Sequence, residues 1–299
     1  MASRIIELSR PLDLSLTLRG LAHGRRDPSM RFDGRNDVWR AVRTPDGPAT
    51  EHIVVVSDRV EIEAWGPGAD RLLGMAPDLL GEHDDPGSFS PQHPRLRELH
   101  RRSPGLRIGR SCGVVEVMIR TILEQKIPGA SARESFRKLV YRFGEKAPGP
   151  RGLWLQPDPA AMARLPYYEL HPLGIERKRA IVLKQVCTSA SRLERLIHAD
   201  ISEAKRALES IPGIGPWTVA ITSGLALGDT DAVEVGDYHL AHNVAWVLAG
   251  EPRATDERML ELLEPYRGQR TRAIRLIEAR GPRAPRFGPR LSLAAIDSI

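Results

Sequence analysis

The segment IPGIGP at residues 211–216 constrains the fold of this chain more than any other stretch. The residues on both sides of it (201–210 and 216–227) have the apolar spacing of helices, so the segment is expected to be a tight hairpin between two helices. Its two glycines, Gly213 and Gly215, let the backbone approach another molecule closely. The second helix presents unpaired N-terminal amides at the hairpin, and such amides favour an anion, for example a backbone phosphate.

An aspartate follows this hairpin. Asp237 lies 22 residues after Gly215, directly before an apolar helical pattern, and is a candidate N-cap residue. The nearby acids Asp229, Asp231 and Glu234 are interpreted as solvated loop residues. A Gly-x-Gly turn or a capping aspartate is common by itself, but the two together in this spacing indicate a functional site.

The first hundred residues have the pattern of a small β-rich domain. Alternating apolar and polar residues predict a strand at 12–18, and three more strands are expected at 37–43, 51–57 and 59–65. One or two short helices are expected within 68–83. Glycine and proline cluster at 86–94 and 104–109, which places a boundary in this zone. The sequence therefore predicts a mixed α/β N-terminal domain over residues 1–105.

From about residue 111 the apolar spacing becomes helical. Helices are predicted at 113–126, 131–144, 158–165, 177–190, 201–210, 216–227, 238–249, 255–264 and 269–280. These helices indicate an all-α domain over residues 106–281, followed by a basic C-terminal tail at 282–299. The expected fold class is α+β, with the small β-rich domain preceding the all-α domain.

Charge and composition exclude several classes of protein. The chain carries a net charge of +6, and arginines gather at 95–110 and 267–290, where they support binding to a polyanion without establishing it. The absence of any run of eighteen apolar residues argues against a membrane span. Two cysteines, Cys112 and Cys187, cannot form a four-cysteine zinc site or iron–sulfur cluster. We expect a cytoplasmic, nucleoid-associated location.

The hairpin and Asp237 together resemble the signature of the helix-hairpin-helix DNA glycosylases. The resemblance is closest to the bacterial DNA-3-methyladenine glycosylase II branch, and it extends beyond the hairpin. Residues 103–126 are similar to the segment that opens the helical domain of that branch, and residues 174–186 to the helix before the hairpin. The resemblance covers most of residues 100–280 with specific motifs, whereas for residues 1–100 it concerns the architecture alone.

This resemblance implies roles for several residues. Asp237 would be the catalytic residue, stabilising positive charge on the deoxyribose as the N-glycosidic bond breaks. Relatives that also cleave the strand use a lysine at the position of Trp217, and an indole cannot form a Schiff base. DNA contacts are expected from the hairpin, its exit and the loop after residue 124, and the base pocket from residues near Asp237. The DNA-contact residues are Gly213, Ile214, Gly215, Thr218, Gln125 and Lys126, and the pocket residues are Trp217, Ile221 and Tyr238.

The chain departs from the pattern of that branch at three positions. Lys126, followed by Ile127, stands where the branch has a leucine wedge. Ile221 takes the place of a pocket tyrosine, and Glu278 that of a pocket tryptophan. The pocket is therefore expected to be less aromatic than that of the branch, and its preferred base is open.

The expected function is that of a monofunctional base excision repair glycosylase, which removes alkylated purines of the 3-methyladenine type after flipping them out of duplex DNA. The expected partner is double-stranded DNA with damaged bases. We expect no cofactor, no metal, no membrane contact and a monomer. Two alternatives stay open: a non-catalytic DNA-binding module, and a glycosylase for another lesion such as a deaminated base or a bulky adduct. Replacing Gly213 by valine is expected to weaken DNA binding while leaving the fold mostly intact.

Overall fold

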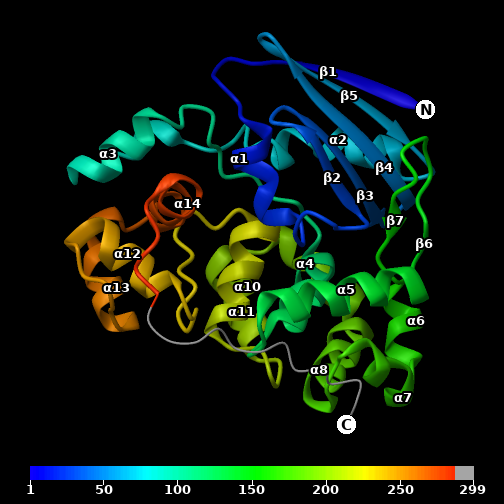
Figure 1. The fold of residues 1–299 in the computed structure, drawn as a ribbon. Coiled ribbons are helices and arrows are strands. Elements are labelled where there is room, and N and C mark those ends of the chain that lie inside the picture. The colour runs from blue at the N-terminus through cyan, green and yellow to red at the C-terminus, as the bar shows by residue number, and fades with distance from the viewer. Residues whose placement is uncertain (287–299) are drawn as a thin grey trace.

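The N-terminal part of the chain is a five-stranded antiparallel sheet with the strand order β1-β5-β4-β3-β2, as seen in the computed structural model, which describes residues 1–286. Its strands are β1 (Ala2–Glu7), β2 (Met30–Gly34), β3 (Asp37–Thr44), β4 (Gly47–Val56) and β5 (Arg59–Trp65). Val38, Ile53 and Ile62 lie side by side across the three central strands and are buried on one face. Helices α1 (Leu14–Leu18) and α2 (Ala69–Leu79) pack on the sheet, and the helical part lies below it in Figure 1.

The predicted strand at 12–18 is wrong, because most of this segment is helix α1. The Asp13 carboxylate accepts the Leu16 N–H at 2.9 Å and so caps the helix. Leu14 and Leu18, four residues apart, are both buried by this turn. The leucines therefore fit a helical spacing as well as an alternating one, and the capping aspartate favours the helix.

Most of the remaining chain is helical. The helices are α3 (Pro94–Arg101), α4 (Val114–Glu124), α5 (Gly129–Phe143), α6 (Pro159–Arg164), α7 (Tyr167–Leu170), α8 (Arg177–Thr188), α9 (Ala190–Glu194), α10 (Ile201–Glu209), α11 (Pro216–Thr222), α12 (Leu240–Ala249), α13 (Asp256–Leu263) and α14 (Arg270–Arg280). Two short strands, β6 (Glu145–Lys146) and β7 (Trp154–Leu155), form a ribbon between α5 and α6. The predicted α+β class, with a β-rich part followed by a helical one, is confirmed.

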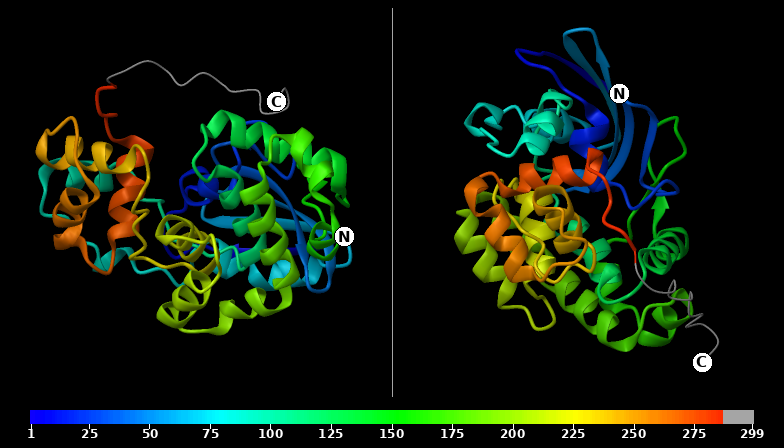
Figure 2. Two further views of the ribbon diagram at one scale, coloured as in Figure 1. Left: turned by 90° about the horizontal axis from the view of Figure 1, so that it is seen from below. Right: turned by 60° about the vertical axis from the view of Figure 1, so that its left-hand side comes forward.

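The helices pack around two separate apolar cores. The first, the α4 core, is built on α4, most of whose residues are buried, together with α5, α8 and α11. The second, the α12 core, joins α12, α13 and α14 with α3, and Figure 2 shows these elements on one side of the molecule. Helix α3 precedes the predicted boundary at residue 105 and yet packs on α12 and α14. The division at residue 105 stays a prediction.

Buried arginines connect these parts. Arg40 on β3 binds Glu51 on β4 at 3.0 Å and Glu116 on α4 at 2.8 Å, which links the sheet to the α4 core. Arg272 on α14 binds Asp84 in the segment after α2. No helix within residues 1–286 is long and apolar enough to cross a membrane. Most of the predicted tail, residues 287–299, lies outside the described residues.

Candidate active site and nucleic-acid interface

The hairpin between α10 and α11 exposes its backbone while its apolar side chains point inward. Gly213 has φ +88°, a left-handed conformation that favours glycine, and a Cβ added there would lie 2.4 Å from Cγ2 of Val182 on α8. Ile214 is buried in the α4 core. Gly215 is extended and caps α11, and a Cβ added there would meet nothing within 4 Å. Open space therefore lies next to the backbone at Gly215, as a close approach by another molecule requires.

Gln125 connects the end of α4 to this hairpin. Its Nε2 donates to the Gly213 carbonyl oxygen at 3.1 Å and to Thr218 Oγ1 at 3.0 Å. The Thr218 side chain is buried, so its hydroxyl serves this internal contact and is not presented on the surface. The next residue, Lys126, is exposed and has φ +57°. Gln125 thus fixes the loop that presents Lys126 beside the hairpin.

Asp237 accepts three N–H groups. Its Oδ1 accepts the backbone N–H groups of His239 and Leu240, each at 2.8 Å, and its Oδ2 accepts Nε1 of Trp217 at 3.3 Å. Helix α12 begins at Leu240, two residues later than predicted, and its N-cap residue by backbone geometry is His239. The expected capping contact by Asp237 is nevertheless present. Every partner is an N–H donor, so both carboxylate oxygens of Asp237 act as acceptors.

The three predicted pocket residues differ in their surroundings. Trp217 is partly buried and points its indole N–H at Asp237. Ile221 packs against the α4 core. Tyr238 is 77% exposed, and its ring lies edge-on against His239. The structure therefore brings Trp217 to Asp237, whereas the pocket roles of Ile221 and Tyr238 stay predictions.

Carboxyl groups that the sequence analysis did not assign to the site surround Asp237. The pKa of Glu234 is raised to about 8, first by burial and then by the charges of Glu278 and Asp237. The pKa of Glu278 is also raised, first by burial and then by Asp237, although its side chain retains exposed surface. The pKa of Glu124, at the end of α4, is raised by burial and by Asp237 in the same way. These three acids are therefore close enough to Asp237 for its charge to raise their pKa values.

The interpretation of the nearby acids as solvated loop residues is wrong. Asp229 is buried and binds Ser223 Oγ at 3.0 Å and Lys205 Nζ at 3.1 Å. Asp231 forms an ion pair with Arg270 on α14. Glu234, unlike Asp229 and Asp231, forms no ion pair with a cation within residues 1–286. A charged residue within three positions of Asp237 was a usable sequence signal, but its burial could not be read from the sequence.

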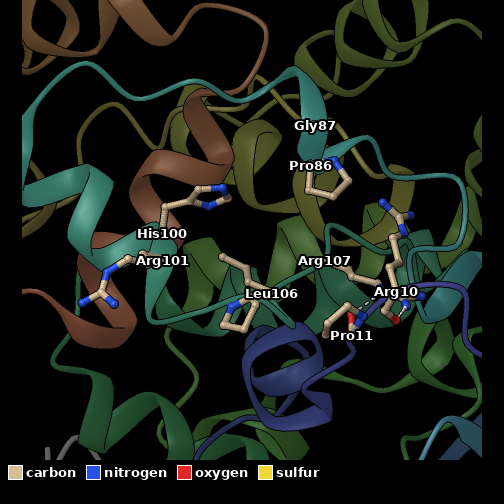
Figure 3. Close-up of a pocket in the computed structure, with 9 residues that line it drawn as sticks. Arg10, Pro11, Pro86, Gly87, His100, Arg101, Leu106 and Arg107 are labelled. Atoms are coloured by element: carbon tan, nitrogen blue, oxygen red, sulfur yellow. Dashed lines mark hydrogen bonds between the residues drawn. The ribbon is translucent and has the colours of Figure 1, made fainter.

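Two cavities lie elsewhere. The first, about 330 Å³, is lined by Arg10, His100, Arg101 and Arg107 together with apolar residues of the α3 region, as Figure 3 shows. Its Arg10 and Arg107 bond to backbone carbonyl groups. The second, about 540 Å³, lies between α2 and the segment at Arg110 and Cys112. Neither cavity contains a residue that the sequence analysis assigned to the site. Within the described part of the chain, no cluster of three or more side chains is suited to hold a metal ion.

Comparisons with known proteins found a matching family and several similar proteins. Residues 119–267 match the model of the HhH-GPD superfamily base excision DNA repair proteins. The chain is 25% identical over 213 residues to a probable bifunctional transcriptional activator/DNA repair enzyme AlkA of Mycobacterium tuberculosis, covering 67% of this chain and 42% of that protein. It is 30% identical over 125 residues to DNA-3-methyladenine glycosylase 2 of Escherichia coli, covering 41% and 44%. The chain thus spans about half or less of the length of these relatives.

Solved structures share the fold over nearly the whole chain. A 3-methyladenine DNA-glycosylase from Archaeoglobus fulgidus superposes with a TM-score of 0.73 at 20% identity, covering 92% of this chain and 96% of that one. An 8-oxoguanine glycosylase/lyase from Clostridium acetobutylicum superposes with a TM-score of 0.71 at 13% identity, covering 93% and 96%. At these identities the likeness concerns the fold, including the N-terminal sheet, and leaves the chemistry to the residues.

Proposed function

Because the chain belongs to the helix-hairpin-helix superfamily of base excision DNA repair proteins, we propose that it is a monofunctional DNA glycosylase that removes alkylated purines from duplex DNA. The observation that carries the proposal is the pairing of Trp217 with Asp237 next to the hairpin. The hairpin would bind the DNA backbone, and Asp237 would serve the reaction.

The proposed chemistry follows from the charge that develops during bond cleavage. Breaking the bond between C1′ and N9 of a purine nucleoside leaves positive charge on the sugar ring, as in glycoside hydrolysis. A fixed carboxylate next to that ring stabilises the charge without reorganisation. Asp237 is fixed in this way, because three N–H donors hold its two oxygens. It would also orient the water that attacks C1′.

The proposed substrate must leave the duplex to reach Asp237. Flipping a nucleotide costs a few kcal/mol, and less where the base is damaged. An alkylated purine with a formal positive charge is attracted to an aromatic face. Trp217, whose indole N–H donates to Asp237, would provide that face. Lys126, exposed beside the hairpin, would occupy the gap in the duplex or bind a phosphate next to it.

The absence of strand cleavage is proposed from the residue at position 217. A Schiff base with the abasic sugar needs a primary amine, and the indole of Trp217 has none. Borohydride reduction during the reaction would trap a covalent protein–DNA adduct if any lysine formed such an intermediate. We expect no adduct, and a trapped adduct would show that the enzyme is bifunctional.

The decisive experiment compares release of methylated purines from duplex DNA by the wild type and by Asp237→Asn. The variant keeps the size of the side chain but loses its charge, so we expect release to fall by on the order of 10³-fold. Asp33→Asn, on strand β2 and paired with Arg151, is the matched control with the same change in charge. Equal rates for wild type and Asp237→Asn would remove Asp237 from the mechanism. Salt-sensitive binding with no base released by the wild type would identify a DNA-binding module instead.

A glycosylase for another lesion is the second candidate function. The observation that favours it is that Ile221 and Glu278 stand at positions that are aromatic in the branch the sequence resembles. A panel of duplexes, each with one alkylated, deaminated or bulky base, distinguishes the two candidates. Faster release of a base other than an alkylated purine would favour the second one.

A further inference from the structure

Glu234 is held in a fixed position relative to Asp237. The Asp237 N–H donates to the Glu234 carbonyl oxygen at 3.1 Å and closes a tight turn, in which Gly236 has φ +92°. The Gly236 N–H donates to Asp256 Oδ2 at 2.9 Å, which fastens the turn to α13. The two carboxyl groups therefore belong to one rigid loop.

The two carboxyl groups have opposite surroundings. Asp237 accepts three N–H groups, whereas Glu234 Oε2 is shielded from solvent and has no hydrogen-bond partner within residues 1–286. A buried carboxylate oxygen without a donor is costly in its charged form. Glu234 as a whole residue is only partly buried.

The charges that face Glu234 come from its own loop and from α14. Glu278 and Asp237 repel a negative charge on Glu234, and Arg275, one turn before Glu278 on α14, attracts it. Burial and Glu278 outweigh Arg275, so the pKa of Glu234 lies at about 8 and the side chain carries a proton at pH 7. A carboxyl group that keeps its proton at neutral pH can act as a general acid.

We propose that Glu234 is the general acid of this site and donates its proton to a ring nitrogen of the departing purine. The proposal rests on the proposed glycosylase function. As the bond between C1′ and N9 breaks, its electron pair stays on the purine, which takes up the Glu234 proton and leaves as a neutral base. Water then bonds to C1′, loses its proton to Asp237 or solvent, and Glu234 regains a proton from solvent. One water is consumed for each base released.

This assignment has different consequences for cationic and for neutral purines. A cationic alkylpurine such as 7-methylguanine leaves without a donated proton because it departs as a neutral molecule. A neutral lesion such as hypoxanthine would depart as an anion unless it is protonated. General acid catalysis contributes about 10²- to 10⁴-fold to such a step. Glu234 is therefore expected to matter for hypoxanthine far more than for 7-methylguanine.

The test is single-turnover release of hypoxanthine and 7-methylguanine from duplexes that are otherwise identical, by the wild type, Glu234→Gln and Glu278→Gln. Glutamine has the same shape as glutamate and no acidic proton. We expect Glu234→Gln to lower hypoxanthine release by on the order of 10²-fold and 7-methylguanine release by less than about tenfold. Loss of both release activities to the same degree, as a misfolded variant would show, would overturn the proposal.

The pH profile provides a readout that a structural role would not change. Release of hypoxanthine by the wild type should fall as the pH rises through about 8, where Glu234 loses its proton. Glu278→Gln removes a repelling charge, lowers the pKa of Glu234 and should move this fall to lower pH. Glu234→Gln should lack the fall.

The outcomes separate this proposal from the proposed function. Suppose that release of 7-methylguanine depends on Asp237. If hypoxanthine is then not released, or if Glu234→Gln leaves the ratio of the two release rates unchanged, the role of Glu234 is refuted and the glycosylase function is not. Failure of the wild type to release either base refutes the glycosylase function as well.

Discussion

The two hairpin glycines should respond in opposite ways to the same substitution. Gly213→Ala forces alanine into a left-handed conformation, at a cost of roughly 1–2 kcal/mol. Its Cβ would also lie 2.4 Å from Val182 Cγ2 inside the α4 core, and such overpacking costs about 1–3 kcal/mol. We therefore expect the free energy of unfolding to fall by about 2–5 kcal/mol. The sequence-based expectation that a larger residue at Gly213 leaves the fold intact is revised on this ground.

Gly215→Ala should leave the stability unchanged or raise it slightly. The residue is extended and its added methyl group would meet nothing, so the variant gains up to about 1 kcal/mol from a less flexible unfolded chain. If a phosphate binds to this part of the backbone, however, the methyl group occupies its place. Loss of one hydrogen bond to a charged group is worth about 1.5–3 kcal/mol, which is roughly a 10- to 100-fold loss in DNA affinity.

The assay is urea unfolding of each free protein combined with binding to an abasic-site duplex at fixed salt. Val182→Ala and its double variant with Gly213→Ala complete a thermodynamic cycle. In the Val182→Ala background, Gly213→Ala should lower the free energy of unfolding by about 1–3 kcal/mol less, because the overlap with the Val182 side chain is gone. The reasoning is refuted if Gly215→Ala binds DNA as tightly as the wild type, or if Gly213→Ala is as stable as the wild type.

Two further variants test stability. Arg272→Met should lower the free energy of unfolding in urea by about 3–5 kcal/mol, because it leaves Asp84 in the interior without its partner. The double variant Arg272→Met/Asp84→Leu should lose less, and equal losses would contradict this. Glu234→Gln should become more stable relative to the wild type as the pH rises from 5 to 9. The pKa of Glu234 is raised from 4.5 to about 8 in the folded protein, so the wild type loses stability as the pH rises between these two values. A difference in the free energy of unfolding that does not change with pH would contradict this.

The sequence predicted elements whose local signals agree with their tertiary surroundings. Strand β5 alternates regularly between buried and partly buried residues. Helices α8, α10, α13 and α14 begin and end within one or two residues of the predicted positions. The segment at 12–18 failed because its leucines fit two periods and the capping role of Asp13 was not weighed. Strand β1 was missed because most of its residues are exposed, which leaves little apolar pattern to detect.

The site was predictable where the residues form a motif and not where they depend on folding. Gly213, Gly215 and Asp237 follow from spacing within one segment, and the family resemblance pointed to Trp217. The structure brings Trp217 and Asp237 together. The environment of Glu234 depends on α14, more than forty residues further along the chain. Burial of a side chain by a distant helix leaves no local pattern, so its raised pKa appears only in the folded chain.

The hydrogen bond from Trp217 to Asp237 joins two bodies that are packed independently. Trp217 belongs to α11, which is part of the α4 core, and Asp237 precedes α12, which is part of the α12 core. The position of the Asp237 carboxylate relative to Trp217 therefore depends on how the α4 core and the α12 core pack against each other, and not on either core alone. Mutations far from Asp237 that let the bodies slide or hinge would misalign the pair while each body stays folded, so that thermal stability and turnover would be lost separately.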